Sequence, residues 1–180
     1  MHYAGIDVKQ DYAAALTHFK EAASAGSVWA EYAIGVAYET SKGVQQDMDA
    51  AISWYERAAV RNHGPATCAL GLIYKFGPDR IRDQAKAVEY FGRAASLNSS
   101  MAAVQLADSL ERGLGVPVDA TAAKQWYFRA TELSDESTAA AHAAVATIYR
   151  AGRLGIPIDN EKAEQWAESS RKLQRAIGLI

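Results

Sequence analysis

The sequence predicts an all-α fold, a right-handed α/α superhelix (solenoid) of about four helix hairpins that follow one unpaired N-terminal helix. Three observations predict it: a period of 36 residues, helical spacing of apolar residues on both sides of a recurring turn, and a 49% apolar composition that can bury a continuous core. A period of about 20 to 50 residues is typical of arrays in which each unit buries its apolar face on its neighbour.

The period is defined by aspartates. Four of them recur at intervals of 36 residues, and a fifth follows after 40: Asp11, Asp47, Asp83, Asp119 and Asp159. An aspartate that precedes a helix accepts amide hydrogens of the first turn and favours the positive end of the helix dipole. We therefore expect each aspartate to be a helix N-cap. The longer last interval predicts three extra residues near 134–136 and one near Arg153.

A ring pair begins seven residues after each of the first four aspartates. The pairs are His18-Phe19, Trp54-Tyr55, Tyr90-Phe91 and Trp126-Tyr127. Alanines lie three residues before each pair and four residues after its first member, and spacings of three and four define one helix face. This pattern predicts the second helix of each hairpin, with His18 packed as a ring equivalent to the tryptophans.

A different pattern precedes each turn and predicts the first helix of each hairpin. In Ala30, Ile34 and Tyr38, for example, a small residue, a branched apolar residue and a ring follow at i, i+4 and i+8, which is one stripe of an amphipathic helix. Glycine or alanine follows the branched residue, as in Gly35, and we expect it to let a neighbouring helix come close.

The turns predict positive φ angles four residues before the aspartates. Glycine occupies this position at Gly43, Gly115 and Gly155, and aspartate occupies it at Asp7 and Asp79. Both residue types tolerate a positive φ at a helix-ending turn. The predicted helices span residues 11–24, 28–41, 47–60, 65–76, 83–96, 100–112, 119–132, 137–150 and 160–174.

We expect a single repeat domain over residues 1–180. It divides into a partial repeat and four whole ones: 1–27, 28–63, 64–99, 100–135 and 136–180. The chain begins inside a repeat, which favours either a truncated array or a first helix that acts as a cap. Regularity is lost around residues 77–80 and after Leu133.

The second repeat carries the whole motif. It contains Ile34-Gly35, Tyr38, Gly43-Val44, Asp47, Trp54-Tyr55 and Ala58-Ala59. This pattern resembles the Sel-one-like repeat (SLR) family, relatives of the tetratricopeptide repeats, over nearly the whole chain. The resemblance implies a non-catalytic scaffold that binds another protein, or a peptide segment of one, in a concave groove. Bacterial members of that family are associated with envelope signalling, host interaction and neutralisation of secreted toxins.

Composition excludes several other classes. The formal net charge of -2 provides no basic stripe for nucleic acid. No apolar run approaches the roughly 20 residues that cross a membrane, so we expect a soluble protein, in the bacterial periplasm, envelope or cytoplasm. One cysteine excludes an internal disulfide and any zinc site of several thiolates. The four histidines are scattered, and we expect neither metal nor cofactor. The sequence leaves the oligomeric state open.

The partner is expected on the first helices, which line the concave side of such arrays. The candidate contact residues flank the core positions of these helices: Trp29, Tyr32, Val36, Glu39, Leu72, Lys75, Phe76, Val104, Asp108, Glu111, Arg112 and Arg150. Trp29, Tyr32 and Phe76 lie outside the ring positions of the repeat, and exposed aromatic residues are common anchors of interfaces. Packing against a neighbouring helix is the alternative interpretation of these three residues.

Two other functions stay open at the sequence level. One is an immunity protein that neutralises a secreted toxin, which would be a special case of protein binding. The other is an enzyme or binder that acts on β-lactams or peptidoglycan, for which only Cys68, Asp108 and Glu111 are available. Cys68 lies among alanines and a leucine, where a small side chain packs well. We therefore expect no catalytic residue.

Overall fold

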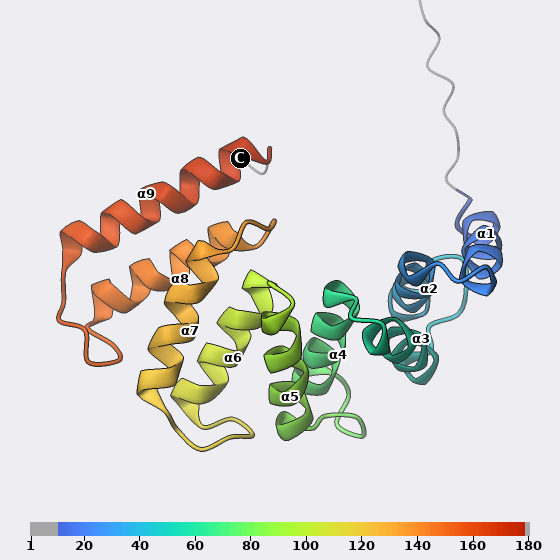
Figure 1. Cartoon of the computed structure of the whole chain (residues 1–180), viewed down its shortest axis with the longest axis horizontal. Coiled ribbons are helices and arrows are strands. Elements are labelled where there is room, and N and C mark those ends of the chain that lie inside the picture. The colour runs from blue at the N-terminus through green and yellow to red at the C-terminus, as the bar shows by residue number, and fades with distance from the viewer. Residues whose placement is uncertain (1–10, 179–180) are drawn as a thin grey trace, which may run out of the picture. The chain divides into compact units, whose positions relative to one another are not determined.

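The computed structural model describes residues 11–178, which form nine helices and no strand (Figure 1). The helices are α1 (Tyr12–Ser24), α2 (Val28–Thr40), α3 (Met48–Val60), α4 (Gly64–Phe76), α5 (Gln84–Ser96), α6 (Ser100–Arg112), α7 (Ala120–Glu132), α8 (Thr138–Ala151) and α9 (Asn160–Ala176). Their ends differ from the predicted ends by at most two residues. The all-α prediction is confirmed.

The N-cap prediction is confirmed at all five aspartates. Each side chain accepts a hydrogen bond from an amide in the first turn of the helix that follows. At α1, for example, Asp11 Oδ1 accepts from the amides of Ala13 and Ala14 at 3.1 and 2.9 Å. The repeat therefore keeps its aspartate because the residue starts each second helix.

The chain divides into two compact units, which are described separately. The N-unit comprises residues 1–63 and contains α1, α2 and α3. The C-unit comprises residues 64–180 and contains α4 to α9. In the N-unit α2 packs on α3 and on α1. In the C-unit the hairpins α4–α5, α6–α7 and α8–α9 pack on one another through α5–α6 and α7–α8.

The first helices of the C-unit lie on its inner side. Helix α6 contacts both α4 and α8, whereas no contact of similar extent joins α5 to α7 or α7 to α9 in residues 64–178. When neighbouring hairpins contact each other through their first helices but not through their second helices, the array curves toward the first helices. The first helices of this unit are therefore on the side where a partner was expected.

The hairpins α2–α3, α4–α5 and α6–α7 are each closed by a ring packed on a small residue. A Cβ added to Gly35 would come within 2.6 Å of the Tyr55 ring, and one added to Gly71 within 2.5 Å of the Phe91 ring. Ala107 and Tyr127 share a buried cluster in the next hairpin. The expected close approach of helices at glycine or alanine is confirmed in these three hairpins, where the second member of the ring pair makes the contact.

The prediction for His18 is wrong. Its side chain is 77% exposed and lies 3.4 Å from the exposed carboxylate of Glu21. The physical reason is its position, because the first ring of each pair lies at the edge of the hairpin. The equivalent Trp54 and Trp126 are only half-buried, and a polar imidazole at such a position stays hydrated.

The turns follow the prediction at three positions and depart from it at a fourth. Gly43, Gly115 and Gly155 have φ angles of +74°, +75° and +72°, as expected, whereas Asp79 does not have a positive φ. The chain turns differently there, because the amides of residues 81 and 82 both donate to the carbonyl of Pro78. Asp7 lies outside the described residues.

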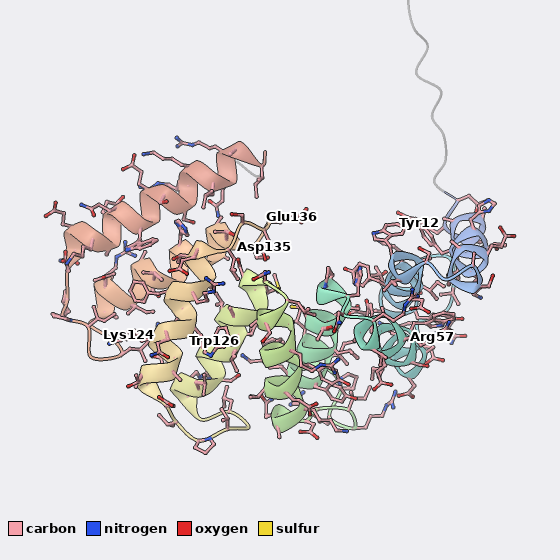
Figure 2. The ribbon with its side chains drawn as sticks, viewed as in Figure 1. Tyr12, Arg57, Lys124, Trp126, Asp135 and Glu136 are labelled. Carbon is pink, nitrogen blue, oxygen red and sulfur yellow. The ribbon has the colours of Figure 1, made fainter. Side chains whose placement is uncertain are left out.

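The expected insertions lie in the fourth and fifth repeats. Five residues separate α7 from α8, and among them Asp135 (Figure 2) accepts a hydrogen bond of 2.6 Å from the amide of Ser100, the first residue of α6. The turn after α8 contains one extra residue, and Leu154 there has a φ of +56°. The first insertion thus provides a hydrogen-bond acceptor for the first turn of α6, in the same repeat.

We predict that Gly71→Ala destabilises the protein by about 1 to 3 kcal/mol, because the new methyl group overlaps the Phe91 ring and forces the hairpin apart. Gly92→Ala in α5 is the matched control. Its new Cβ would meet nothing within 4 Å, so it should stabilise α5 by about 0.5 to 1 kcal/mol. Urea unfolding followed by circular dichroism measures both changes. Equal effects of the two substitutions would contradict the packing argument.

Candidate functional site

An apolar groove lies between α1 and α2 in the N-unit. It has a volume of about 350 Å³. Helix α1 contributes Tyr12 (Figure 2), Ala15, Leu16 and Phe19. Helix α2 and the turn after it contribute Trp29, Tyr32, Ala33, Val36, Ala37 and Lys42. Three of the predicted contact residues, Trp29, Tyr32 and Val36, are therefore brought together, and sequence reasoning did not anticipate the contribution of α1.

Trp29 and Tyr32 differ in how exposed their rings are and in which helices they pack against. The indole of Trp29 is 59% exposed and meets the Phe19 ring edge-on, with 5.4 Å between ring centroids. Tyr32 is half-buried and its ring lies 5.7 Å from that of Tyr55 and 5.0 Å from that of His63. Trp29 is thus exposed as expected, whereas Tyr32 also packs against the next helix.

Glu39, the fourth predicted residue of the N-unit, is committed to the hairpin. Its Oε2 accepts a hydrogen bond of 2.6 Å from the Tyr55 hydroxyl. Burial, followed by this hydrogen bond to Glu39, raises the pKa of Tyr55 above its usual value. The hydroxyl therefore stays protonated and continues to donate at any physiological pH.

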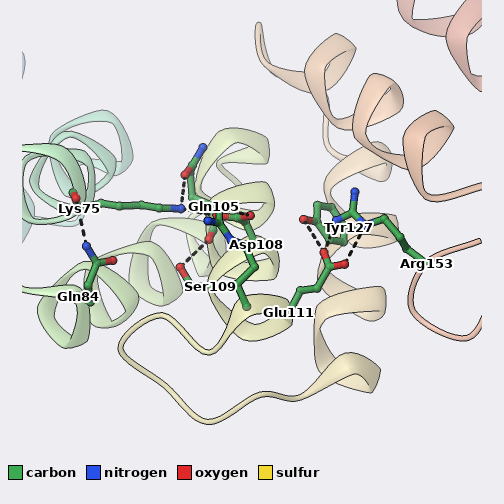
Figure 3. A network of polar contacts seen from close by, with 9 residues as sticks. Lys75, Gln84, Gln105, Asp108, Ser109, Glu111, Tyr127 and Arg153 are labelled. Carbon is green, nitrogen blue, oxygen red and sulfur yellow. Dashed lines mark hydrogen bonds and ion pairs between the residues drawn. The ribbon is translucent and has the colours of Figure 1, made fainter. Parts of the chain in front are cut away.

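A polar network occupies the equivalent face of the C-unit (Figure 3). Lys75 is 6% exposed, and its Nζ lies 2.7 Å from Asp108 Oδ2 and 2.8 Å from Gln105 Oε1. Arg112 approaches the other oxygen of Asp108 at 3.5 Å. A buried ammonium needs such partners to compensate for lost hydration. Lys75 therefore joins α4 to α6.

Glu111 forms the second half of this network (Figure 3). Arg153 holds its carboxylate with two contacts, one of them from Nε to Oε1 at 2.8 Å, and the Tyr127 hydroxyl donates to Oε2 at 3.3 Å. Burial and the negative charge of Glu111 raise the pKa of Tyr127 to about 12. Arg153, which sequence reasoning noted only as the site of an insertion, is the residue that neutralises Glu111.

The ring opposite each of these charged residues matches its chemistry. Glu39, Lys75 and Glu111 recur at intervals of 36 residues, as do Tyr55, Phe91 and Tyr127. The two glutamates face tyrosines that donate to them, whereas Lys75 lies 5.9 Å from the centroid of a phenylalanine. An ammonium cannot accept a hydrogen bond, so no hydroxyl is needed. The alternation was visible in the sequence and was missed there.

The remaining predicted residues of the C-unit differ in exposure. Phe76 is 64% exposed, with the ammonium of Lys75 5.2 Å from its ring centroid. Arg112 and Arg150 are also exposed, and Arg150 lies 3.9 Å from Glu164. Leu72 and Val104 are half-buried. The accessible candidates in this unit are therefore one aromatic ring and two guanidinium groups.

The chemistry of the described residues offers little for catalysis. Cys68 is buried, as expected, and burial raises the pKa of its thiol. A thiol of raised pKa holds its proton and is a poor nucleophile. Residues 11–178 contain no cluster of three His, Cys, Asp or Glu side chains that could hold a metal ion. None of their helices is long and apolar enough to span a membrane.

Comparison with solved structures places the fold among known repeat proteins. A Sel1 repeat protein from Oxalobacter formigenes is 28% identical, with a TM-score of 0.74, over 89% of this chain and 65% of that one. A protective antigen of uropathogenic Escherichia coli strains with an SLR fold, c5321, is 27% identical, with a TM-score of 0.76, over 87% of this chain and 33% of that one. The chain thus spans less than two thirds of either relative.

Two other comparisons add no function. The immunity protein Pa5087 from Pseudomonas aeruginosa is 15% identical, with a TM-score of 0.47, over 97% of this chain and 77% of that one. A likeness of that strength carries no argument. No functionally curated protein matches the sequence significantly.

The family model for the Sel1 repeat matches five segments of the sequence. They are residues 1–27, 30–63, 64–99, 100–135 and 139–174. These segments cover most of the chain, and they contain the aspartate caps and the ring-on-glycine packing described above. The protein therefore belongs to the Sel1 repeat family.

Proposed function

We propose that this protein is a non-catalytic scaffold that binds a segment of another protein on its first helices. The observation that carries the proposal is the exposure of Trp29 on α2 and of Phe76 on α4. Neither ring occupies a core position of the repeat, so the fold gains little from either one. Large exposed rings surrounded by polar groups are common energetic anchors of protein interfaces.

In the N-unit the anchor lies beside an apolar groove. Trp29 lines it together with Val36, and Phe19 supports the indole from α1. Apolar concave surfaces gain binding free energy when a partner displaces water from them. This unit is therefore suited to an apolar side chain or helix face.

In the C-unit the anchor lies beside fixed charges. Phe76 follows Lys75 in the sequence. The ion pair between Lys75 and Asp108 fixes the positions of these two charged side chains. Arg112 adds an exposed guanidinium next to the same carboxylate. Groups held in place before binding lose less entropy when a partner arrives. We propose Phe76 as the anchor and Arg112 as a neighbouring polar contact.

The enzyme alternative finds no support in the same residues. Asp108 and Glu111 are each paired with a cation, through Lys75 and Arg153. A carboxylate whose oxygens are held by a cation has little freedom to turn toward a substrate, because the cation would lose its partner. The Cys68 thiol is buried and protonated. We therefore do not propose a catalytic role.

One prediction concerns the two anchors, Trp29 and Phe76. A partner is first captured by affinity pull-down, identified by mass spectrometry and purified. We expect Trp29→Ala and Phe76→Ala together to weaken its binding by about 2 to 4 kcal/mol, because hot-spot rings contribute on that scale. Isothermal titration calorimetry measures the loss, and the melting temperature should change little.

Matched controls are available in each unit. Val60 in α3 and Val118 in the turn after α6 are also exposed apolar residues, but neither lies on a first helix. Val60→Ala and Val118→Ala should leave binding unchanged. If the double anchor variant loses folding and binding to the same extent, both rings belong to the core and the proposal is wrong.

Another prediction concerns catalysis. Incubation with a chromogenic β-lactam and with purified peptidoglycan should give no turnover above the buffer control, because no free nucleophile or general acid faces solvent among the candidate residues. Absorbance and chromatography of released fragments are the measurements. Turnover that Cys68→Ala or Glu111→Gln abolishes would replace the scaffold proposal with an enzyme.

A further inference from the structure

Arg112 in the C-unit shares its carboxylate with a cation that holds it more closely. Lys75 Nζ lies 2.7 Å from Asp108 Oδ2, whereas the guanidinium of Arg112 approaches Oδ1 only to 3.5 Å. The Arg112 side chain is 62% exposed and that of Asp108 only 26%. A guanidinium carries five N–H donors. Most of the donors of Arg112 are therefore accessible to a partner.

Arg153, beside the same helix end, shows how a guanidinium in this fold engages a carboxylate fully. Its Nε donates to Glu111 Oε1 at 2.8 Å, and a terminal nitrogen contacts Glu111 Oε2. Such two-point pairing is the strongest geometry between a guanidinium and a carboxylate. The hydrogen bond to Glu111 accordingly raises the pKa of Arg153. Within residues 11–178, Arg112 makes no pairing of this kind.

Arg112 and Phe76 occupy the same place in consecutive repeats. They are 36 residues apart and are the last residues of α6 and α4. These two helices contact each other, and Lys75 crosses from α4 to Asp108 on α6 (Figure 3). Packed helices lie about 8 to 10 Å apart. The exposed ring and the exposed guanidinium are therefore neighbours, separated by roughly one helix spacing.

The same sharing recurs on the next first helix. Arg171 lies 2.6 Å from one oxygen of Glu164 in α9, and Arg150 of α8 lies 3.9 Å from the other. Arg150 is exposed and, like Arg112, is the more distant of two cations on one carboxylate. The C-terminal ends of α6 and α8 thus each present an accessible guanidinium on the first-helix side.

We propose that the first helices of the C-unit bind an acidic segment of a partner protein, with a carboxylate on Arg112 and a large apolar side chain on Phe76. Positive charge that the fold neutralises only loosely is complementary to such a segment. The inference rests on the proposed scaffold function and names the chemistry of the partner at the C-unit.

The spacing of the two contacts defines the motif. A separation of about 10 Å corresponds to roughly three residues of extended chain. Helix α6 contacts both α4 and α8, which leaves no gap as wide as a helix between them. The partner is therefore an extended segment with an acidic residue two or three positions from a large apolar one, and a second acidic residue farther along would reach Arg150.

A helix-dipole role is the alternative explanation of Arg112. A cation at the C-terminal end of a helix is favourable beside the last carbonyls, whether or not a partner binds. That role predicts that Arg112→Gln lowers the melting temperature and leaves the choice of partner unchanged. The binding role predicts a change in the choice of partner.

The test begins with a phage-displayed library of random peptides, selected in parallel on the whole protein and on its Arg112→Glu variant. Peptides common to both selections bind elsewhere and are set aside. Among peptides that only the unchanged protein selects, we expect Asp or Glu near a large apolar residue at least about threefold more often than in the library, because complementary charge selects partners. The variant should enrich Lys or Arg instead.

A second measurement isolates the contact. One selected peptide is synthesised with its acidic residue and with the corresponding amide, and fluorescence anisotropy gives the affinity of each form. The unchanged protein should bind the acidic form about tenfold more tightly, because a charge-assisted hydrogen bond is lost in the amide. Arg112→Gln should bind both forms equally.

Arg129→Gln is the matched control. Arg129 lies on α7, a second helix of the same unit, where it is exposed and paired with Glu132 at 2.9 Å. This variant should keep the preference for the acidic peptide. Melting temperatures of both variants, measured by circular dichroism, show whether either substitution disturbs the fold.

Four results would overturn the inference. They are no peptide specific to the unchanged protein, no excess of acidic residues in such peptides, equal binding of the acidic and amide forms, and a preference that Arg112→Gln retains. Selected peptides that Phe76→Ala weakens but that show no acidic preference would sink only this inference. An acidic preference that depends on Arg112 but not on Phe76 would instead sink Phe76 as the proposed anchor.

Discussion

The structure depends on one contact, the ring of a second helix packed directly on glycine or alanine of the first. At Gly35 and Gly71 the ring leaves no space for a Cβ. The residue four positions later lies on the same helix face, so close approach also brings Glu39 to the Tyr55 hydroxyl and Lys75 over Phe91. The apolar seam and the polar contact at its end therefore arise from the same helix spacing, and a larger residue at the seam would disturb both.

The two units offer different surfaces beside this contact. In the C-unit the Phe91 ring packs on Gly71, and Lys75 follows four residues later. The Lys75 ammonium connects neighbouring repeats through Asp108, so this face is a fixed polar network. In the N-unit, Phe19 and Ala15 of α1 line the apolar groove together with Trp29 and Val36 of α2. The N-unit therefore offers an apolar surface and the C-unit a polar one.

Sequence reasoning succeeded where the cause is local. A capping aspartate and a turn glycine act within a few residues, so the helix bounds and the φ angles of Gly43 and Gly115 followed from spacing alone. It failed where burial depends on a distant neighbour. Nothing near His18 reveals that its side of the helix stays open, and Glu111 meets Arg153 only because α8 ends beside α6. The prediction of a positive φ at Asp79 failed for a different reason, because the chain makes another turn at Pro78.

The distribution of polar groups favours recognition over chemistry. The repeating aspartates are used by helix amides, the glutamates of the first helices by tyrosine hydroxyls, and Asp108 by Lys75. A group held by such partners has little freedom to exchange a proton or attack a substrate, because either step would leave a partner unsatisfied. The exposed rings of Trp29 and Phe76 are not among the groups held in this way. In the proposed scaffold, binding free energy comes from burying Trp29 and Phe76, and the fixed charges around Phe76 and the shape of the groove beside Trp29 are the features proposed to select the partner.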